Sequence, residues 1–137
     1  MESGKWKVES RKCKVESMKE DHVYRRLVVY EKAIDFVVHV YALIRKFPKE
    51  EQYALCDQLR RAVVSIPSNI AEGMGRASNK EKAHFIEIAY ASLMEVECQC
   101  DIAQKLGYIS EEELKNIDAE STELERLLSG LRSSMQK

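Results

Sequence analysis

The chain has few of the residues that build turns, disulfide networks or membrane spans. Its 137 residues include only 2 prolines, 5 glycines and 4 cysteines, and aromatic residues make up 7%. So little glycine and proline leaves few turns for a sheet and favours long helices in one domain. No stretch approaches the roughly 20 apolar residues of a membrane-spanning helix, and the N-terminus is charged where a signal peptide is apolar. We expect a soluble, cytoplasmic protein that makes no membrane contact.

The cysteines do not form a metal-binding or disulfide pattern. Cys13, Cys56, Cys98 and Cys100 are too sparse for a secreted disulfide framework, and no two are spaced as a CxxC pair. On a helix, residues two apart point about 200° away from each other, so Cys98 and Cys100 cannot share a metal ion. We predict reduced, structural thiols.

The net charge of -1 is unevenly distributed along the chain. Residues 45–82 hold eight basic and five acidic residues, whereas residues 83–137 hold five basic and eleven acidic ones. A total charge near zero argues against a dedicated nucleic-acid binder, but a local basic excess allows a basic patch. The plain alternative is that these side chains only keep the surface soluble. The candidate phosphate-contacting residues are Arg76, Lys80, Lys82 and Arg60.

The N-terminal segment differs from the rest. KWKVES at residues 5–10 recurs as KCKVES at residues 12–17. Two copies are too few for a coiled coil, so we interpret residues 1–23 as a mobile tail and residues 24–137 as the folded bundle. An alternative is that the repeat reflects duplicated upstream DNA and that translation starts at Met18.

Helix-start and helix-stop signals divide the folded part into four segments. Pro48 ends the first helix, and Gly107 ends the third. Ser78 with Glu81 and Ser110 with Glu113 match the capping-box pattern of helix starts. Short connections between long helices favour an all-α, up-down-up-down antiparallel four-helix bundle. The predicted helices span approximately residues 24–46, 49–73, 79–106 and 110–133.

The second predicted helix contains a proline. Its apolar stripe, which includes Leu59, Val63, Ile66 and Ile70, stays in phase across Pro67, so the pattern predicts a continuous helix that is kinked there. The opposite side is polar. We interpret it as a buried or interfacial network that fixes helix register; the alternative is a small polar ligand held by Arg61, Asn69 and Glu72. The polar stripe consists of Arg61, Ser65, Ser68, Asn69 and Glu72.

Two of the predicted helices are apolar over more of their circumference than one core contact requires. A monomer seldom exposes so much apolar surface, so the pattern predicts an oligomer. The predicted interface residues are Ala83, Ile86, Tyr90 and Met94 on the third helix, with Phe36 and Leu43 on the first.

No motif for catalysis, metal binding or cofactor binding is complete. A di-iron bundle needs two Glu-x-x-His motifs, and only Glu81 with His84 matches. Ser65 and Ser68 have no histidine nearby in the sequence and no glycine elbow, and no phosphate-binding glycine loop is present. We predict no enzymatic activity, no metal and no cofactor.

A specific stretch of sequence identifies a family. LRRAVVSIPSNIAEG at residues 59–73 follows FPKEEQYALCDQ and precedes Arg76, Ser78, AYASLMEVE at residues 89–97 and LGYI at residues 106–109. Over residues 27–131 the chain resembles the bacterial four-helix-bundle proteins encoded in ribosomal RNA intervening sequences, which include the accessory variability proteins of diversity-generating retroelements. The resemblance implies a four-helix subunit, a ring of five subunits, and no known enzymatic activity.

For the retroelement branch, the resemblance also implies a basic surface that binds a reverse transcriptase and nucleic acid. This chain departs from that branch in its acidic C-terminal half. We therefore predict a non-enzymatic homo-oligomer, with five subunits, that acts as a scaffold or adaptor for RNA, DNA or a nucleic-acid enzyme. The alternatives are the small-ligand-binding bundle and a module that only binds another protein.

Overall fold

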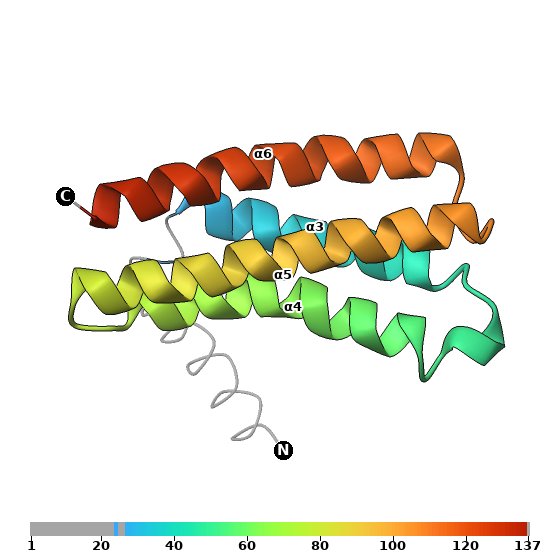
Figure 1. Cartoon of the computed structure of the whole chain (residues 1–137), viewed down its shortest axis with the longest axis horizontal. Coiled ribbons are helices and arrows are strands. Elements are labelled where there is room, and N and C mark those ends of the chain that lie inside the picture. The colour runs from blue at the N-terminus through green and yellow to red at the C-terminus, as the bar shows by residue number, and fades with distance from the viewer. Residues whose placement is uncertain (1–23, 25–26, 137) are drawn as a thin grey trace, which may run out of the picture.

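The structure, a computed structural model, describes residue 24 and residues 27–136 (Figure 1). The predicted tail and its repeat lie outside the described residues. The described part forms α3 (Val28–Ile44), a 3₁₀ helix η1 (Lys49–Glu51), α4 (Leu55–Met74), α5 (Asn79–Lys105) and α6 (Glu111–Met135), with no strand among these residues. The predicted all-α four-helix bundle is confirmed.

The four long helices pack in chain order and close on themselves. α3 contacts α4, α4 contacts α5, α5 contacts α6, and α6 returns to contact α3. Successive helices run in opposite directions (Figure 1). The apolar faces meet along one continuous core, in which side chains from all four helices are fully buried. Its largest members are Phe36, Leu59, Ile66, Ile70, Ile86, Leu93, Leu124 and Leu128.

The predicted start of the second helix was wrong. Instead of one helix from residue 49, a short η1 turn is followed by α4 from Leu55, and Ala54 has a non-helical backbone with φ -119° and ψ -102°. The Glu51 carboxylate accepts a hydrogen bond from the Leu55 backbone (3.3 Å) and another from the Tyr108 hydroxyl (3.3 Å). A side chain from the distant α5–α6 loop thus holds a break that local sequence does not mark.

The other helix boundaries follow the capping signals closely. The Ser110 hydroxyl accepts from the Glu113 backbone (3.0 Å), and the Glu113 carboxylate accepts from the Ser110 backbone (2.9 Å), which completes a capping box. Ser78 accepts from the Glu81 backbone (3.1 Å) at the start of α5. Gly107 has a φ of 81°, a left-handed conformation that suits glycine and ends α5.

Helix α4 runs without interruption through the buried Pro67, as predicted. The structure does not confirm the predicted kink. Two side chains after the proline bond to carbonyls of the preceding turn: the Ser68 hydroxyl donates to Val64 O (2.8 Å), and the Asn69 amide donates to Ser65 O (2.8 Å). Proline supplies no N–H for the Val63 carbonyl, and these two side-chain bonds go to the next two carbonyls, so they add contacts beside that position without replacing its missing bond.

The packing of α4 against α5 has a fixed register. The Ser65 and Ser92 hydroxyls are 2.8 Å apart, and the Gln99 amide lies 3.5 Å from Gln58 Oε1 two helical turns away. Near the turn that joins the helices, a Cβ atom added at Gly73 would lie 2.7 Å from the Phe85 Cβ. The two helices therefore approach each other closely at this point, where only glycine fits.

We predict that Gly73→Ala destabilises the protein by about 1–3 kcal/mol, because the added methyl group overpacks the contact with Phe85. Gly130→Ala is the matched control, since that position in α6 faces open space and alanine favours a helix by up to about 1 kcal/mol. Urea denaturation of both variants measures the difference. Equal changes in the free energy of unfolding would contradict the close approach.

Candidate functional site

Three of the four predicted phosphate-contacting residues gather at the α4–α5 turn. Arg76 follows the end of α4, and Lys80 and Lys82 lie in the first turn of α5. Arg76 and Lys80 are exposed, and Lys82 is half-buried. A hollow of about 560 Å³ opens at this end of the bundle and is lined by Arg76, Ser78, Lys80, Glu81, His84 and Phe85.

The Arg76 side chain is held in place by two contacts. Its guanidinium carbon lies 4.6 Å from the centre of the Phe85 ring, and one of its nitrogens lies 3.1 Å from a Glu72 carboxylate oxygen. The Phe85 ring is half-buried, and a guanidinium at the protein surface over such a ring gains about 0.5–1 kcal/mol and keeps N–H groups available at its edge. The close packing of Gly73 on Phe85 sets the position of that ring.

Arg60 does not belong to this group. It lies 16 residues before Arg76, which corresponds to roughly 24 Å of helix. Its guanidinium pairs with Asp57 at 3.3 Å. The structure therefore brings together Arg76, Lys80 and Lys82 but leaves Arg60 at the other half of α4.

The predicted polar stripe on α4 separates into two parts. Ser65 and Asn69 face α5, where the Asn69 amide donates to Ser65 Oγ (2.8 Å) and Ser65 meets Ser92. Arg61, Ser68 and Glu72 are exposed, with Ser68 bonded to its own helix and Glu72 paired with Arg76. These side chains therefore do not form a single ligand-binding site. Sequence reasoning missed Ser92, because it lies within an apolar stripe of α5.

The residues predicted to form an oligomer interface lie mainly inside the subunit. Phe36 and Ile86 are 0% exposed and Ala83 is 5% exposed, while Leu43, Tyr90 and Met94 are half-buried against the core. α5 contacts both α4 and α6, which accounts for its two apolar stripes without a second copy. The three buried side chains cannot contact another subunit, whereas Leu43, Tyr90 and Met94 stay predicted interface residues. The exposed apolar residues on α3 and α4 are instead Val28, Ile34, Val38 and Val64.

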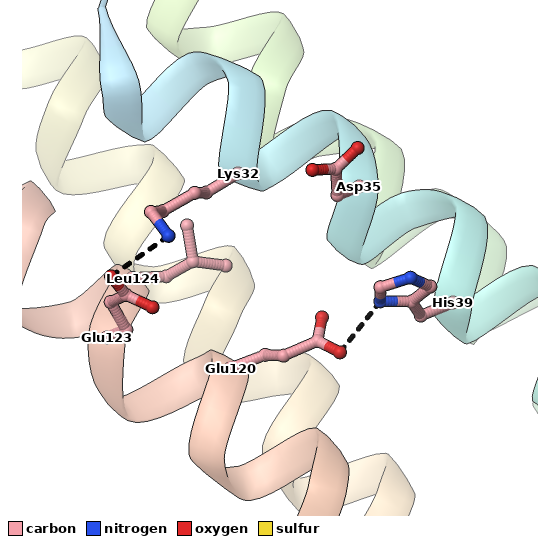
Figure 2. Close-up of a pocket in the computed structure, with 6 residues that line it drawn as sticks. All are labelled: Lys32, Asp35, His39, Glu120, Glu123 and Leu124. Carbon is pink, nitrogen blue, oxygen red and sulfur yellow. Dashed lines mark hydrogen bonds and ion pairs between the residues drawn. The ribbon is translucent and has the colours of Figure 1, made fainter.

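Basic side chains on α3 and just after it pair with carboxylates of α6 (Figure 2). Lys32 lies 3.0 Å from Glu123, His39 Nδ1 lies 2.7 Å from Glu120, and Lys46 pairs with Glu113. The hydrogen bond from Lys46 and the bond from the Ser110 backbone lower the pKa of Glu113. A shallow hollow of about 220 Å³ lies here. Because the pairs are exposed, each is expected to contribute at most about 1 kcal/mol to stability.

Several carboxylates gather where α5 packs on α6, while elsewhere along the same seam Arg132 pairs with Glu87 at 3.8 Å. Burial, a hydrogen bond with Glu125, and the Glu125 and Asp118 charges raise the pKa of Glu97 to about 7, and a hydrogen bond with the Ser121 hydroxyl acts in the opposite direction. Burial and the charges of Asp101 and Glu125 also raise the pKa of Asp118. Sequence reasoning missed this cluster, because its members are separated along the chain and come together only when α5 and α6 pack.

No group of three or more His, Cys, Asp or Glu side chains among the described residues could hold a metal ion. Burial raises the pKa of the Cys100 thiol to about 12, which keeps it protonated and unreactive.

No helix in the described part of the chain is long and apolar enough to cross a membrane.

The described residues define an all-helical four-helix bundle with a basic turn between α4 and α5. The family model of the 23S rRNA-intervening sequence protein matches residues 25–130, so the chain belongs to this family. Its structure is similar to the 1.70 Å crystal structure of a protein with unknown function from the S23 ribosomal protein family of Bacteroides thetaiotaomicron. The two chains are 25% identical with a TM-score of 0.71, over 77% of this chain and 98% of the other. A search of curated proteins gives no match.

We predict that the protein becomes less stable as the pH rises from about 5 to 7. Glu97 has a pKa of about 7 in the folded chain and an ordinary value of 4.5. The folded state therefore holds a proton that the unfolded state has already released, and this preference is lost as the pH passes through the folded pKa. Thermal unfolding across this range measures the slope. Glu97→Gln should flatten it, whereas Glu111→Gln, an exposed control, should leave it unchanged.

Proposed function

We propose that this chain is a non-enzymatic, homo-oligomeric scaffold that binds RNA at the α4–α5 turn and holds it for a nucleic-acid enzyme such as a reverse transcriptase. The observation that carries this proposal is the stacked Arg76 beside Lys80 and Lys82 at one end of the bundle. A guanidinium offers its N–H groups in a planar fork that matches two phosphate oxygens, and lysine adds positive charge.

The start of α5 adds a second contribution to phosphate binding. The free backbone N–H groups of a first helical turn carry partial positive charge and suit an anion. Lys80 and Lys82 lie in that turn. Contacts of this kind position a phosphate backbone without reading its bases, so the proposed recognition depends on RNA shape more than on sequence.

The names of the relatives refer to the ribosome. The family is named after the intervening sequence of 23S ribosomal RNA, in which the resemblance places the gene, and the similar crystal structure is described as a member of the S23 ribosomal protein family. These words describe those proteins. We extend them to this chain because its basic end has the chemistry that an RNA backbone requires.

Fluorescence anisotropy with a structured RNA and a duplex DNA tests this proposal. Three phosphate contacts predict that affinity falls with a log–log salt slope of about -2 to -3, or several tens of fold between about 50 and 200 mM salt. Arg76→Ala/Lys80→Ala/Lys82→Ala should abolish most of this dependence.

The matched control is Arg45→Ala/Lys49→Ala/Lys105→Ala, which removes the same charge from three exposed residues near the other end of the bundle. This control should keep at least half of the affinity. Equal losses in both variants would mean that overall charge, not the α4–α5 turn, governs binding. Absence of binding at the lower salt would refute the RNA proposal.

The oligomeric part of the proposal rests on the exposed apolar residues of α3 and α4. Val38 is 61% exposed and Val28 is 54% exposed, and Ile34 and Val64 lie on the same two helices. Ile34 and Val38 lie about one turn apart on one side of α3, and exposed apolar side chains in such positions are favourable to cover with a second apolar surface. The family resemblance implies a ring of five subunits, and our proposal keeps this number.

We predict that Val38→Glu dissociates the oligomer while the subunit stays folded, since that side chain contributes little to the core. Size-exclusion chromatography with light scattering measures the mass, and circular dichroism checks the helices. Leu106→Glu, which also places a charge at an exposed apolar position, is the control. A wild-type monomer, or an intact Val38→Glu oligomer, would refute this interface. Ile86 is unsuitable for the test, because a charge at that buried position would unfold the subunit.

A further inference from the structure

A second hollow adjoins the basic α4–α5 turn. It has a volume of about 410 Å³ and lies where the start of α5 meets the end of α6. The end of α6 and the α4–α5 turn lie at the same end of the bundle (Figure 1). Lys80 and His84 line this hollow and also the hollow beside Arg76, so the two hollows share a wall. We call it the His84 hollow, and it is lined by Lys80, Ala83, His84, Glu87, Met135 and Gln136.

The His84 hollow combines an apolar base with a polar rim. Ala83 is buried and Met135 is half-buried against the core, whereas Lys80, His84 and Glu87 are exposed. Sites for small molecules and cofactors have volumes of about 300–1,000 Å³ and set a few polar groups around an apolar lining. The size and the chemistry of this hollow therefore suit a flat, partly polar group.

His84 presents an aromatic ring at this surface. Its ring centre lies 5.9 Å from that of Phe85, with an angle of 73° between the two planes, so the rings meet edge to face. The Arg76 guanidinium lies over the same Phe85 ring. The exposed His84 ring has no hydrogen bond or ion pair within the described part of the chain, whereas His39 is held by Glu120 at 2.7 Å. One face of the His84 imidazole is therefore open for stacking.

An unpaired nucleobase matches these features. Single-stranded nucleic acid is bound by positive charge along its backbone together with aromatic side chains, histidine included, on which its bases stack. Lys80 lines both hollows, so a strand whose phosphate lies near Arg76 has its next base beside the His84 ring. We infer that the His84 hollow holds one unpaired base of a single-stranded RNA segment, stacked on His84, while Arg76 and Lys80 contact the phosphates.

The one acidic residue of the His84 hollow is compatible with this occupant. Glu87 on α5 lies 3.8 Å from Arg132 on α6, and this pair reduces the repulsion that a free carboxylate would exert on RNA. A carboxylate oxygen also accepts hydrogen bonds from the amino group of a base.

This inference rests on the proposed RNA binding and deepens it, because it names the form of RNA that the site takes. Phosphate contacts alone attract single strands and duplexes alike. A ring beside them favours a strand whose bases are free, because a paired base is already stacked within its own helix. A strand held by its backbone and one base keeps its remaining bases available for pairing.

Fluorescence anisotropy with two labelled ligands of about ten nucleotides tests the inference: oligoadenylate and an abasic ribose-phosphate strand with the same charge. The wild type should bind oligoadenylate about five- to tenfold more tightly, the lower part of the range for a base stacked on an aromatic side chain. His84→Ala should remove this difference and leave the affinity for the abasic strand unchanged. The salt slope should also stay the same, because stacking releases no counterions.

Three further variants separate stacking from charge and from loss of structure. His84→Phe keeps a ring and should retain the preference for oligoadenylate within about twofold. His84→Lys adds positive charge without a ring and should lose the preference. His39→Ala removes an exposed histidine from the α3–α6 surface and is the matched control, which should bind both ligands as the wild type does. Circular dichroism checks that each variant is folded.

NMR of the imidazole signals gives a readout that does not depend on RNA binding. Adenosine 5′-monophosphate at about 10 mM should shift the His84 signals and leave those of His39 in place, because a free nucleotide carries the same base and phosphate as one unit of the strand. Ribose 5-phosphate, which lacks the base, should leave the His84 signals nearly unchanged.

The two measurements distinguish failure of this inference from failure of the proposed function. Equal binding of oligoadenylate and the abasic strand by the wild type, or an unchanged preference in His84→Ala, would refute the stacked base and leave the phosphate contacts in place. If no RNA binds but adenosine 5′-monophosphate still shifts the His84 signals, the RNA proposal is refuted and the hollow remains a nucleobase site. Absence of both effects would refute both proposals.

Discussion

The close pairing of α4 with α5 is the constraint on which the rest of the structure depends. Gly73 allows the two backbones to meet beside Phe85, and the Ser65–Ser92 hydrogen bond sets the register two turns further on. A shift of either helix would separate these pairs and leave buried hydroxyls without partners. The same packing places Phe85 beneath Arg76, so the geometry of the basic end follows from the register of the core.

Acidic and basic side chains of the bundle gather on different surfaces, and these surfaces do not correspond to separate stretches of the sequence. On α6, one side carries carboxylates that are paired with bases from α3, and the other carries carboxylates that face more carboxylates on α5. The α4–α5 turn has a local excess of arginine and lysine. A net charge near zero therefore conceals surfaces of opposite sign, and these surfaces, not the total charge, determine which ligands the protein attracts.

Local signals were sufficient for most of the fold. The Ser110–Glu113 capping box and the left-handed Gly107 mark their helix ends because each depends on residues within one turn. The break before Leu55 was missed because Glu51 is held by Tyr108, which lies far away in the sequence. The grouping of Arg76 with Lys80 was also predictable from proximity in the chain, whereas its stacking on Phe85 was not.

The sequence by itself determined the four helices, their order, the continuity of α4 through Pro67, and the family to which the chain belongs. These properties depend on periodicity, caps and a specific run of residues. Only the tertiary structure decided that Phe36 and Ile86 are buried inside the subunit, that Ser65 meets Ser92, and that Glu97 lies against Glu125. The rotation of the helices against each other decides which neighbour covers an apolar stripe and which charges meet across two helices. The sequence of one helix alone does not specify that rotation.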